Sequence, residues 1–119
     1  MSQPFVPGDD LVFQLESGFG ILRVLALDGE GANTIWHVLA YDEFFPDVEA
    51  AERALVQPHS LRVRNFHIAL TDRAFERTPA AKLGNRLVSD DELAAYRQWQ
   101  ESDERRVADR SVLLLLGMR

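Results

Sequence analysis

The segment that most constrains this chain is Phe19–Leu27, because it carries apolar side chains on both faces of a strand. Successive side chains of a strand point to opposite faces, and both sets are apolar here, broken only by Arg23, while Gly20 suits a bend or a close contact. Such a strand needs cover on both faces. A chain of 119 residues, 46% of them apolar, can supply that cover within a single domain, 1–119.

Three further segments have the composition of β-strands and are separated by turn-forming residues. They are Leu11–Leu15, Thr34–Tyr41 and Leu61–Leu70. A short helix is expected over Val48–Val56, because Asp47 can cap its first turn and Pro58 stops it. These elements predict a β-rich core at about residues 7–70.

The second half of the chain predicts less regular structure and one long helix. Residues 71–88 read as irregular, apart from a single turn capped by Thr71-Asp72. Ser89 and Glu92 form a capping box, which predicts a helix over about 90–108. The apolar segment 111–117 is short for a helix, so we expect a buried strand or a segment packed under the long helix.

The opening of the chain resembles SH3-like barrels of the Tudor, KOW and CarD types. The resemblance lies in Pro7–Phe13 and Gly18–Val24, which combine a Gly-Asp turn, a short strand, a Gly-x-Gly turn and a strand ending in Val, and in Trp36–Asp42 at the place of a third strand. It implies an α+β, mainly β fold: an SH3-like, partly open antiparallel β-barrel with a short connecting helix and a long C-terminal helix. An α+β meander with one helix is the alternative.

The pattern is also similar, to a lesser degree, to the bacterial immunity proteins numbered 26 in polymorphic-toxin systems. Gly8-Asp9 and Gly18–Leu25 carry this second resemblance. It implies a small cytoplasmic protein that neutralises a toxin by binding it and has no enzymatic activity. SH3-like barrels bind RNA, modified protein tails, polymerase or other proteins, so that resemblance indicates binding without naming the partner.

Charge divides the chain into two unequal halves. Residues 1–59 hold ten acids and two bases, a net charge of −8; residues 60–119 hold nine acids and eleven bases, a net charge of +2, and together these make −6. The acidic half suits a basic protein partner or forms a solvated surface. The bases at 62–86 favour the alternative function, a nucleic-acid or transcription-associated barrel, or pair with the acidic half within or between chains.

The predicted partner-binding surface lies around an acidic loop with two adjacent phenylalanines. Its residues are Trp36, Tyr41, Asp42, Glu43, Phe44 and Phe45. In an extended segment Phe44 and Phe45 cannot both point inward, and an exposed aromatic ring beside carboxylates suits a basic partner. Alternatively, one ring closes the barrel end and the other packs under the helix at 48–56. Trp36 and Tyr41 differ in strand parity, which argues against an aromatic cage.

No catalytic, cofactor-binding or metal-binding residues are predicted. The chain has no cysteine, its three histidines (His37, His59 and His67) lack the short spacing of zinc ligands, and no phosphate-binding loop occurs. We read the histidines as structural. No secretory signal or membrane segment is expected, because the longest apolar run is Val112–Leu116. We therefore expect a cytoplasmic protein-binding module, monomeric or homodimeric, with an enzyme of unrecognised type as the last alternative.

Overall fold

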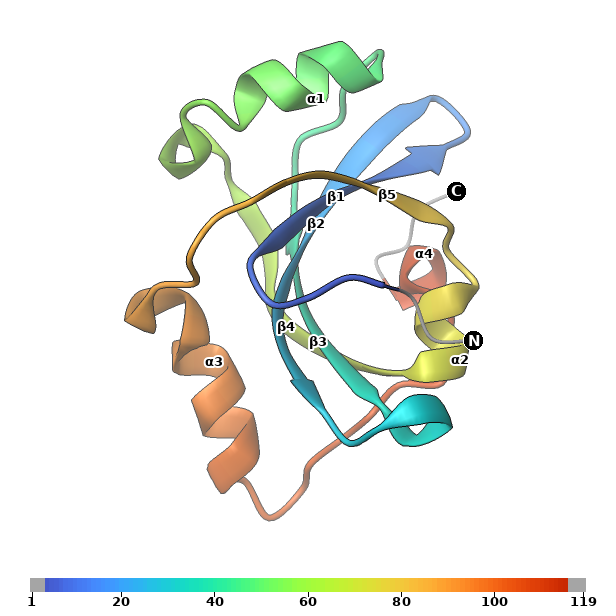
Figure 1. Ribbon diagram of the computed structural model, residues 1–119, viewed down its shortest axis with the longest axis vertical. Helices are drawn as coiled ribbons and strands as arrows, with labels where there is room; N and C mark the ends of the chain where they lie inside the picture. Colours follow the sequence, from blue (N-terminus) through green and yellow to red (C-terminus); the bar gives the residue numbers. More distant parts are fainter. Residues whose placement is uncertain (1–3, 116–119) are drawn as a thin grey trace.

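The strand that is apolar on both faces lies at the centre of the sheet. The computed structural model of the chain describes residues 4–115. It has an α+β architecture with one five-stranded antiparallel sheet in the order β4-β3-β2-β1-β5 (Figure 1). The strands are β1 (Asp9–Leu15), β2 (Gly18–Asp28), β3 (Ile35–Tyr41), β4 (Val63–Thr71) and β5 (Ala80–Asn85). The helices are α1 (Val48–Ala54), α2 (Asp72–Glu76), α3 (Asp90–Glu101) and α4 (Val112–Leu115), with short 3₁₀ turns η1 (Gly31–Asn33) and η2 (Pro58–Ser60).

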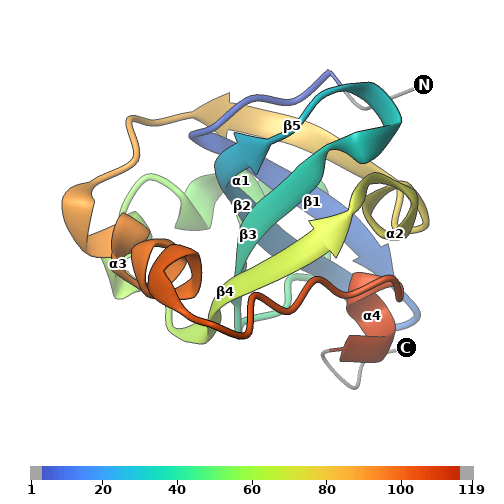
Figure 2. The same cartoon turned by 90° about the horizontal axis from the view of Figure 1, so that it is seen from below.

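Both faces of β2 are covered, as its sequence predicts. Leu22 and Val24 belong to the cluster on the side closed by α2 and α4, whereas Ile21 and Leu25 belong to the cluster under α1 and the start of α3. Figures 1 and 2 show these helices on opposite sides of the curled sheet. Gly20 is a close contact, because a Cβ there would lie 2.5 Å from the Cζ atom of Phe13.

The predicted strands and helix starts around this centre are confirmed. Asp47 caps α1 by accepting a hydrogen bond from the backbone N–H of Ala50 at 2.7 Å. The capping box of α3 is formed: the backbone N–H of Glu92 donates to Ser89 Oγ at 3.2 Å, and Ser89 N–H donates to the Glu92 carboxylate at 3.0 Å. These signals are local, so a few neighbouring residues are enough to set them.

The turn predicted after Thr71-Asp72 is confirmed as α2, but the prediction that the rest of 71–88 is irregular is wrong at β5. Thr71 caps α2, and the chain then returns as β5, which pairs antiparallel with β1 from Phe13↔Ala80 to Asp9↔Asn85. The edge of β1 presents N–H and C=O groups that need partners. β1 lies about seventy residues earlier in the chain. The local sequence of β5 therefore does not show that this segment pairs as a strand.

The long helix and the C-terminal run also differ from expectation. α3 ends at Glu101 rather than near 108, because the chain turns back: Trp99 Nε1 donates to the Arg106 carbonyl at 2.8 Å. Ala108 then pairs with the outer edge of β4, its N–H donating to the Ala69 carbonyl at 2.8 Å. The apolar run forms the turn α4 and not a strand, and its Val112 joins the cluster beside α2 instead of lying under α3. Positions 116 and 117 of the predicted segment lie outside the described residues.

The sheet is curled but not closed, since β4 and β5 are its two edges. Within residues 4–115, none of the helices has both the length and the apolar character needed to cross a membrane.

Candidate functional site

The structure separates the six residues of the predicted partner-binding surface. Trp36 is buried in the core, with 1% of its surface exposed. Its ring stacks on Phe75 at a centroid distance of 4.1 Å, and its Nε1 donates to Asp72 at 2.8 Å. Trp36 therefore cannot belong to an exposed surface, because strand parity turns it into the core. Tyr41 lies in the cluster on the opposite face, as the parity argument predicts.

The acidic loop after β3 is largely neutralised by arginines of the second half. The Asp42 carboxylate pairs with Arg64 at 3.3 Å, and the Glu43 carboxylate accepts from both the backbone and the side chain of Arg62. Phe44 is 49% exposed. Phe45 instead exchanges two backbone hydrogen bonds with Phe19, each 2.8 Å long, and packs against the cluster under α1. One of the two rings is therefore exposed and the other packed.

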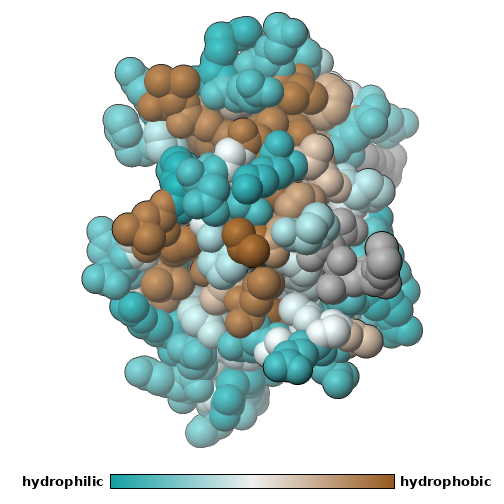
Figure 3. Space-filling model, viewed as in Figure 1, coloured by the Kyte–Doolittle hydropathy of each residue, from teal (hydrophilic) through white to brown (hydrophobic). Residues whose placement is uncertain are grey.

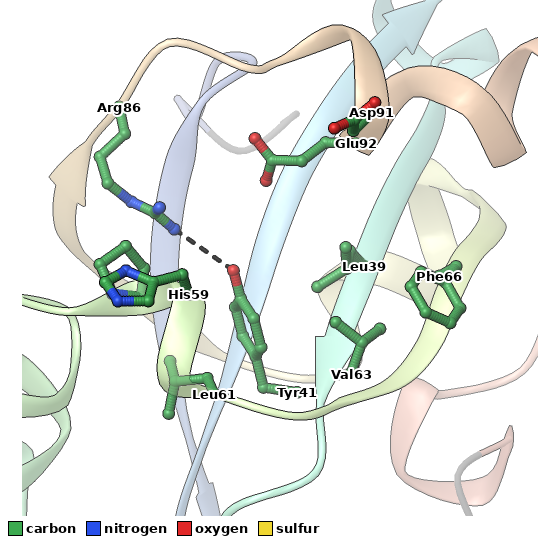
Figure 4. A pocket seen from close by; sticks show the side chains of 10 residues that line it. Leu39, Tyr41, His59, Leu61, Val63, Phe66, Arg86, Asp91 and Glu92 are labelled. Atoms are coloured by element: carbon green, nitrogen blue, oxygen red, sulfur yellow. Dashed lines mark hydrogen bonds between the residues drawn. The ribbon is translucent and has the colours of Figure 1, made fainter.

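A cavity of about 360 Å³ lies on this face of the sheet, beside Tyr41 (Figure 4). Its walls come from β3, the segment from η2 to β4, the residue that follows β5 and the first turn of α3. The lining residues are Leu39, Tyr41, Pro58, His59, Leu61, Val63, Phe66, Arg86, Asp91 and Glu92. In Figure 4 the Tyr41 hydroxyl points to the centre, with Arg86 and Glu92 reaching toward it from different sides. Figure 3 shows the surface hollowed between α1 and α3, where apolar patches flank a hydrophilic band.

A buried network of charges supports the polar side of this cavity. Arg23 is fully buried, and its guanidinium donates to the Glu92 carboxylate, to Asp10 at 3.3 Å, and to the backbone carbonyls of Gly8, Arg86 and Leu87. Arg86 donates to both oxygens of Asp10, at 2.7 and 2.9 Å. The two arginines and the two carboxylates balance in charge, which is the condition for placing them in a low-dielectric interior.

The pKa values around this network follow from the same contacts. The hydrogen bond to Asp10 holds the pKa of Arg86 well above its usual value. Burial raises the pKa of Glu92, but its hydrogen bonds with Arg23 and Ser89 outweigh burial and lower the pKa overall. Burial raises the pKa of Tyr41, so its hydroxyl keeps its proton. The cavity thus holds fixed charges that already have partners, and a Tyr41 O–H whose oxygen accepts from Arg86 at 3.3 Å.

A second cluster brings together side chains that the sequence leaves isolated. His37 is fully buried, and its two ring nitrogens lie 2.8 Å from an Asp28 oxygen and 2.9 Å from His67 Nε2. Tyr96 and Trp99 of α3 pack on His37 at ring-centroid distances of 4.4 and 4.7 Å. His37 and His67 do serve the structure, but they contact each other and have polar partners, whereas His59 is exposed.

Strand register brings these histidines together, and it could not be read from spacing. His37 of β3 pairs with Ala69 of β4, so His67, two residues away on the same strand, projects from the same face. Both histidines lie within segments predicted as strands, but the sequence does not give the register that brings them together. In residues 4–115 no set of three or more His, Asp or Glu side chains is placed to hold a metal ion.

Comparison with known proteins adds no relative to these observations. No protein-family model, curated protein or solved structure matches the chain.

Proposed function

We propose that this chain is a non-enzymatic protein-binding module that recognises a basic partner through the cavity beside Tyr41. The observation that carries the proposal is that the inner charged groups of the cavity already have partners, whereas most of its remaining lining is apolar. Its inner charges, Arg86 and Glu92, are engaged by Asp10, Arg23 and Ser89. Apart from His59 and Asp91, its remaining lining is apolar, which suits contact with a partner better than acid–base chemistry.

The apolar wall fits an aliphatic or aromatic side chain of the partner. Leu61 and Val63 are partly buried, and Phe66 is 65% exposed at the same wall. An exposed phenylalanine next to a hollow is the kind of residue that anchors an interface, because its burial on binding removes a large apolar area from water. The Tyr41 O–H at the floor can donate to a backbone carbonyl of the bound segment.

Charge at the rim favours a basic residue beside that apolar side chain. Asp91 lines the cavity, is exposed, and has no ion-pair partner in the part of the chain that the structure describes. The net charge of −6 adds a long-range attraction for a cation. The partner is therefore basic, as the sequence analysis expects, but we place its binding site at the cavity and not at the Phe44 loop.

The nucleic-acid alternative draws less support from the structure. Most bases of the arginine-rich stretch pair with acids of the same chain, which leaves few for phosphate contacts. The pairs are Arg62–Glu43, Arg64–Asp42, Arg73–Asp109, Lys82–Asp9 and Arg86–Asp10. We retain as part of the proposal an SH3-like, partly open barrel and a cytoplasmic, immunity-type role against a toxin; the antiparallel order of the five strands supports the barrel.

The proposal can be tested with a pair of short peptides in an NMR titration. The probe is an acetylated and amidated Lys-Leu-Phe-Lys tetrapeptide, and Glu-Leu-Phe-Glu is its charge-reversed control. We expect the basic peptide to shift the amide signals of Leu61, Val63 and Phe66. Phe66→Ala should weaken that binding about fivefold or more, since anchor residues contribute more than about 1 kcal/mol.

Two control variants distinguish the cavity from other surfaces. Asp91→Asn should reduce the preference for the basic over the acidic peptide, whereas Phe44→Ala should leave both affinities unchanged. The proposal fails if neither peptide binds at the cavity, or if the two bind equally. A loss of binding in Phe44→Ala with none in Phe66→Ala would return recognition to the acidic loop.

A further inference from the structure

A second cavity, of about 330 Å³, lies at the other end of α3, along the edge of β4. It is lined by Asn65, His67, Ile68, Ala69, Trp99, Arg106, Ala108 and Leu115. It shares no lining residue with the cavity beside Tyr41. Its distinctive feature is His67, which ends a chain of partly buried hydrogen bonds on one side and lines the cavity on the other.

The hydrogen bonds behind His67 start from a carboxylate. Asp28, as an ionised carboxylate, can only accept. The Tyr96 hydroxyl donates to its two oxygens, at 3.0 and 3.1 Å, and burial together with Asp28 raises the pKa of Tyr96 to about 12, so that hydroxyl keeps its proton. His37 Nε2 lies 2.8 Å from the second oxygen of Asp28 and must therefore carry a hydrogen and donate it.

This donor fixes the tautomers of both histidines. Burial lowers the pKa of His37 despite the neighbouring Asp28, so its ring is neutral near pH 7 and its Nδ1 is an acceptor. The 2.9 Å contact between His37 Nδ1 and His67 Nε2 then requires His67 Nε2 to donate. Burial and the nearby His37 lower the pKa of His67 to about 4, so this ring too is neutral. The remaining nitrogen, His67 Nδ1, is left with a lone pair.

That lone pair is accessible. His67 Nδ1 has no hydrogen-bond partner among residues 4–115, yet it does not occur among the fully buried side-chain atoms of that range that lack a partner. Since His67 lines the cavity, a molecule there can reach this nitrogen. The best partner for a neutral imidazole acceptor in a partly apolar site is an N–H or O–H donor.

The walls favour a flat ring. Trp99 and His67 lie 5.8 Å apart between ring centroids, and the indole N–H of Trp99 is already used by the Arg106 carbonyl. What Trp99 offers to a ligand is therefore its ring surface, and Ile68, Ala108 and Leu115 add apolar contacts. Aromatic rings pack well against such walls in offset or edge-to-face arrangements.

We propose that this second cavity binds a small planar heteroaromatic molecule, whose ring N–H or O–H donates to His67 Nδ1 while its ring packs against Trp99. The site is separate from the protein-binding cavity, so either proposal can fail alone.

The first test measures the tautomer. A long-range ¹H–¹⁵N spectrum of the histidine rings at pH 7 should show His67 with its hydrogen on Nε2 and an unprotonated Nδ1. A hydrogen on Nδ1 would overturn the proposal, because the cavity would then face a donor instead of an acceptor.

The second test uses two isosteric probes, indole and benzofuran, which differ in the N–H donor. Indole should bind the wild-type protein at least about fivefold more tightly than benzofuran, and should move the His67 ring signals. In His67→Phe the ring remains and the acceptor is lost, so the preference for indole should fall below about twofold. His59→Phe, at an exposed histidine of the other cavity, should leave the preference intact.

The two probes test the proposal on the wild-type protein alone, so the test does not depend on a stable variant. Equal binding of indole and benzofuran to the wild-type protein, or no binding of either at this cavity, contradicts the proposal without any substitution. A preference for indole that survives in folded His67→Phe contradicts it as well.

Discussion

The two ends of α3 are attached to the same face of the sheet by different chemistry. At its start, Glu92 meets the buried guanidinium of Arg23. At its end, Tyr96 and Trp99 pack their rings on the buried imidazole of His37. The first attachment is a set of balanced charges and the second is a set of neutral rings. The comparison shows how one helix can be held by two buried polar clusters that respond to different perturbations.

The two clusters also differ in what they leave open. Around Arg23 every charged group is engaged, so the cluster can support a cavity without reacting in it. Around His37 the hydrogen bonds run in one direction and end in a nitrogen that has no partner within residues 4–115. A fully satisfied network makes a rigid wall. The open nitrogen of the second cluster is the acceptor on which the proposed ligand site rests.

The largest effect should come from breaking the charged attachment. Arg23→Met keeps the length of the side chain but leaves the buried Asp10 and the Glu92 carboxylate without their shared cation. We expect a loss of about 3–5 kcal/mol in the free energy of unfolding, as is usual when one partner of a buried ion pair is removed. Urea denaturation measures the change.

An exposed ion pair on the same helix provides the matched control. Arg97 pairs with Asp90 at 3.2 Å on the solvent side of α3, where both groups stay hydrated. Arg97→Met should therefore leave the unfolding midpoint almost unchanged. If the two substitutions destabilised the protein equally, burial of the Arg23 network would not be the source of its effect.

A smaller effect, confined to the other end of α3, should appear on mild acidification. His67 takes up a proton at about its usual pKa of 6.5 when unfolded but only at about 4 when folded. Between these values the unfolded chain binds more protons, so stability is complete above pH 6.5 and falls as the pH is lowered toward 4. The lowered pKa of His37 acts in the same direction.

The charged end should respond in a lower window. The pKa of Glu92 is lowered from 4.5, so its contribution to stability is complete above that pH and is lost below it.

The effect of His67 can be measured above that window. Urea titrations from pH 7 to 4.5 should show declining stability in the wild type and a flatter profile in His67→Phe, while amide exchange shows which end of α3 opens. An unchanged profile in His67→Phe would contradict the assignment.

The smallest effect should come from the helix start itself. Ser89→Ala removes the Ser89 oxygen that caps Glu92 N–H and should cost about 1 kcal/mol in unfolding free energy. Thermal or urea denaturation would measure it. Ser89→Asp restores a capping oxygen, so it should recover most of the loss; equal losses in both variants would mean that the cap is not what stabilises this turn.

Features that depend on neighbours in sequence were predictable, and those that depend on pairing at a distance were not. The capping box at Ser89 and the two-sided burial of Phe19–Leu27 follow from local pattern. β5 was missed because its partner β1 lies about seventy residues earlier. Of the predicted surface, Phe44 is exposed, but Trp36 is core. Tyr41 lines a cavity whose other walls come largely from distant segments.

The sequence by itself determined the strand-rich core, the direction of its side chains and the acidic balance of the first half, because alternation, turn residues and charge are properties of short stretches. Only the tertiary structure decided that Arg23 would be buried among carboxylates and that His37 and His67 would meet. Both outcomes depend on strand register and on where α3 lies across the sheet, and these are set by the packing of the whole core rather than by any one segment.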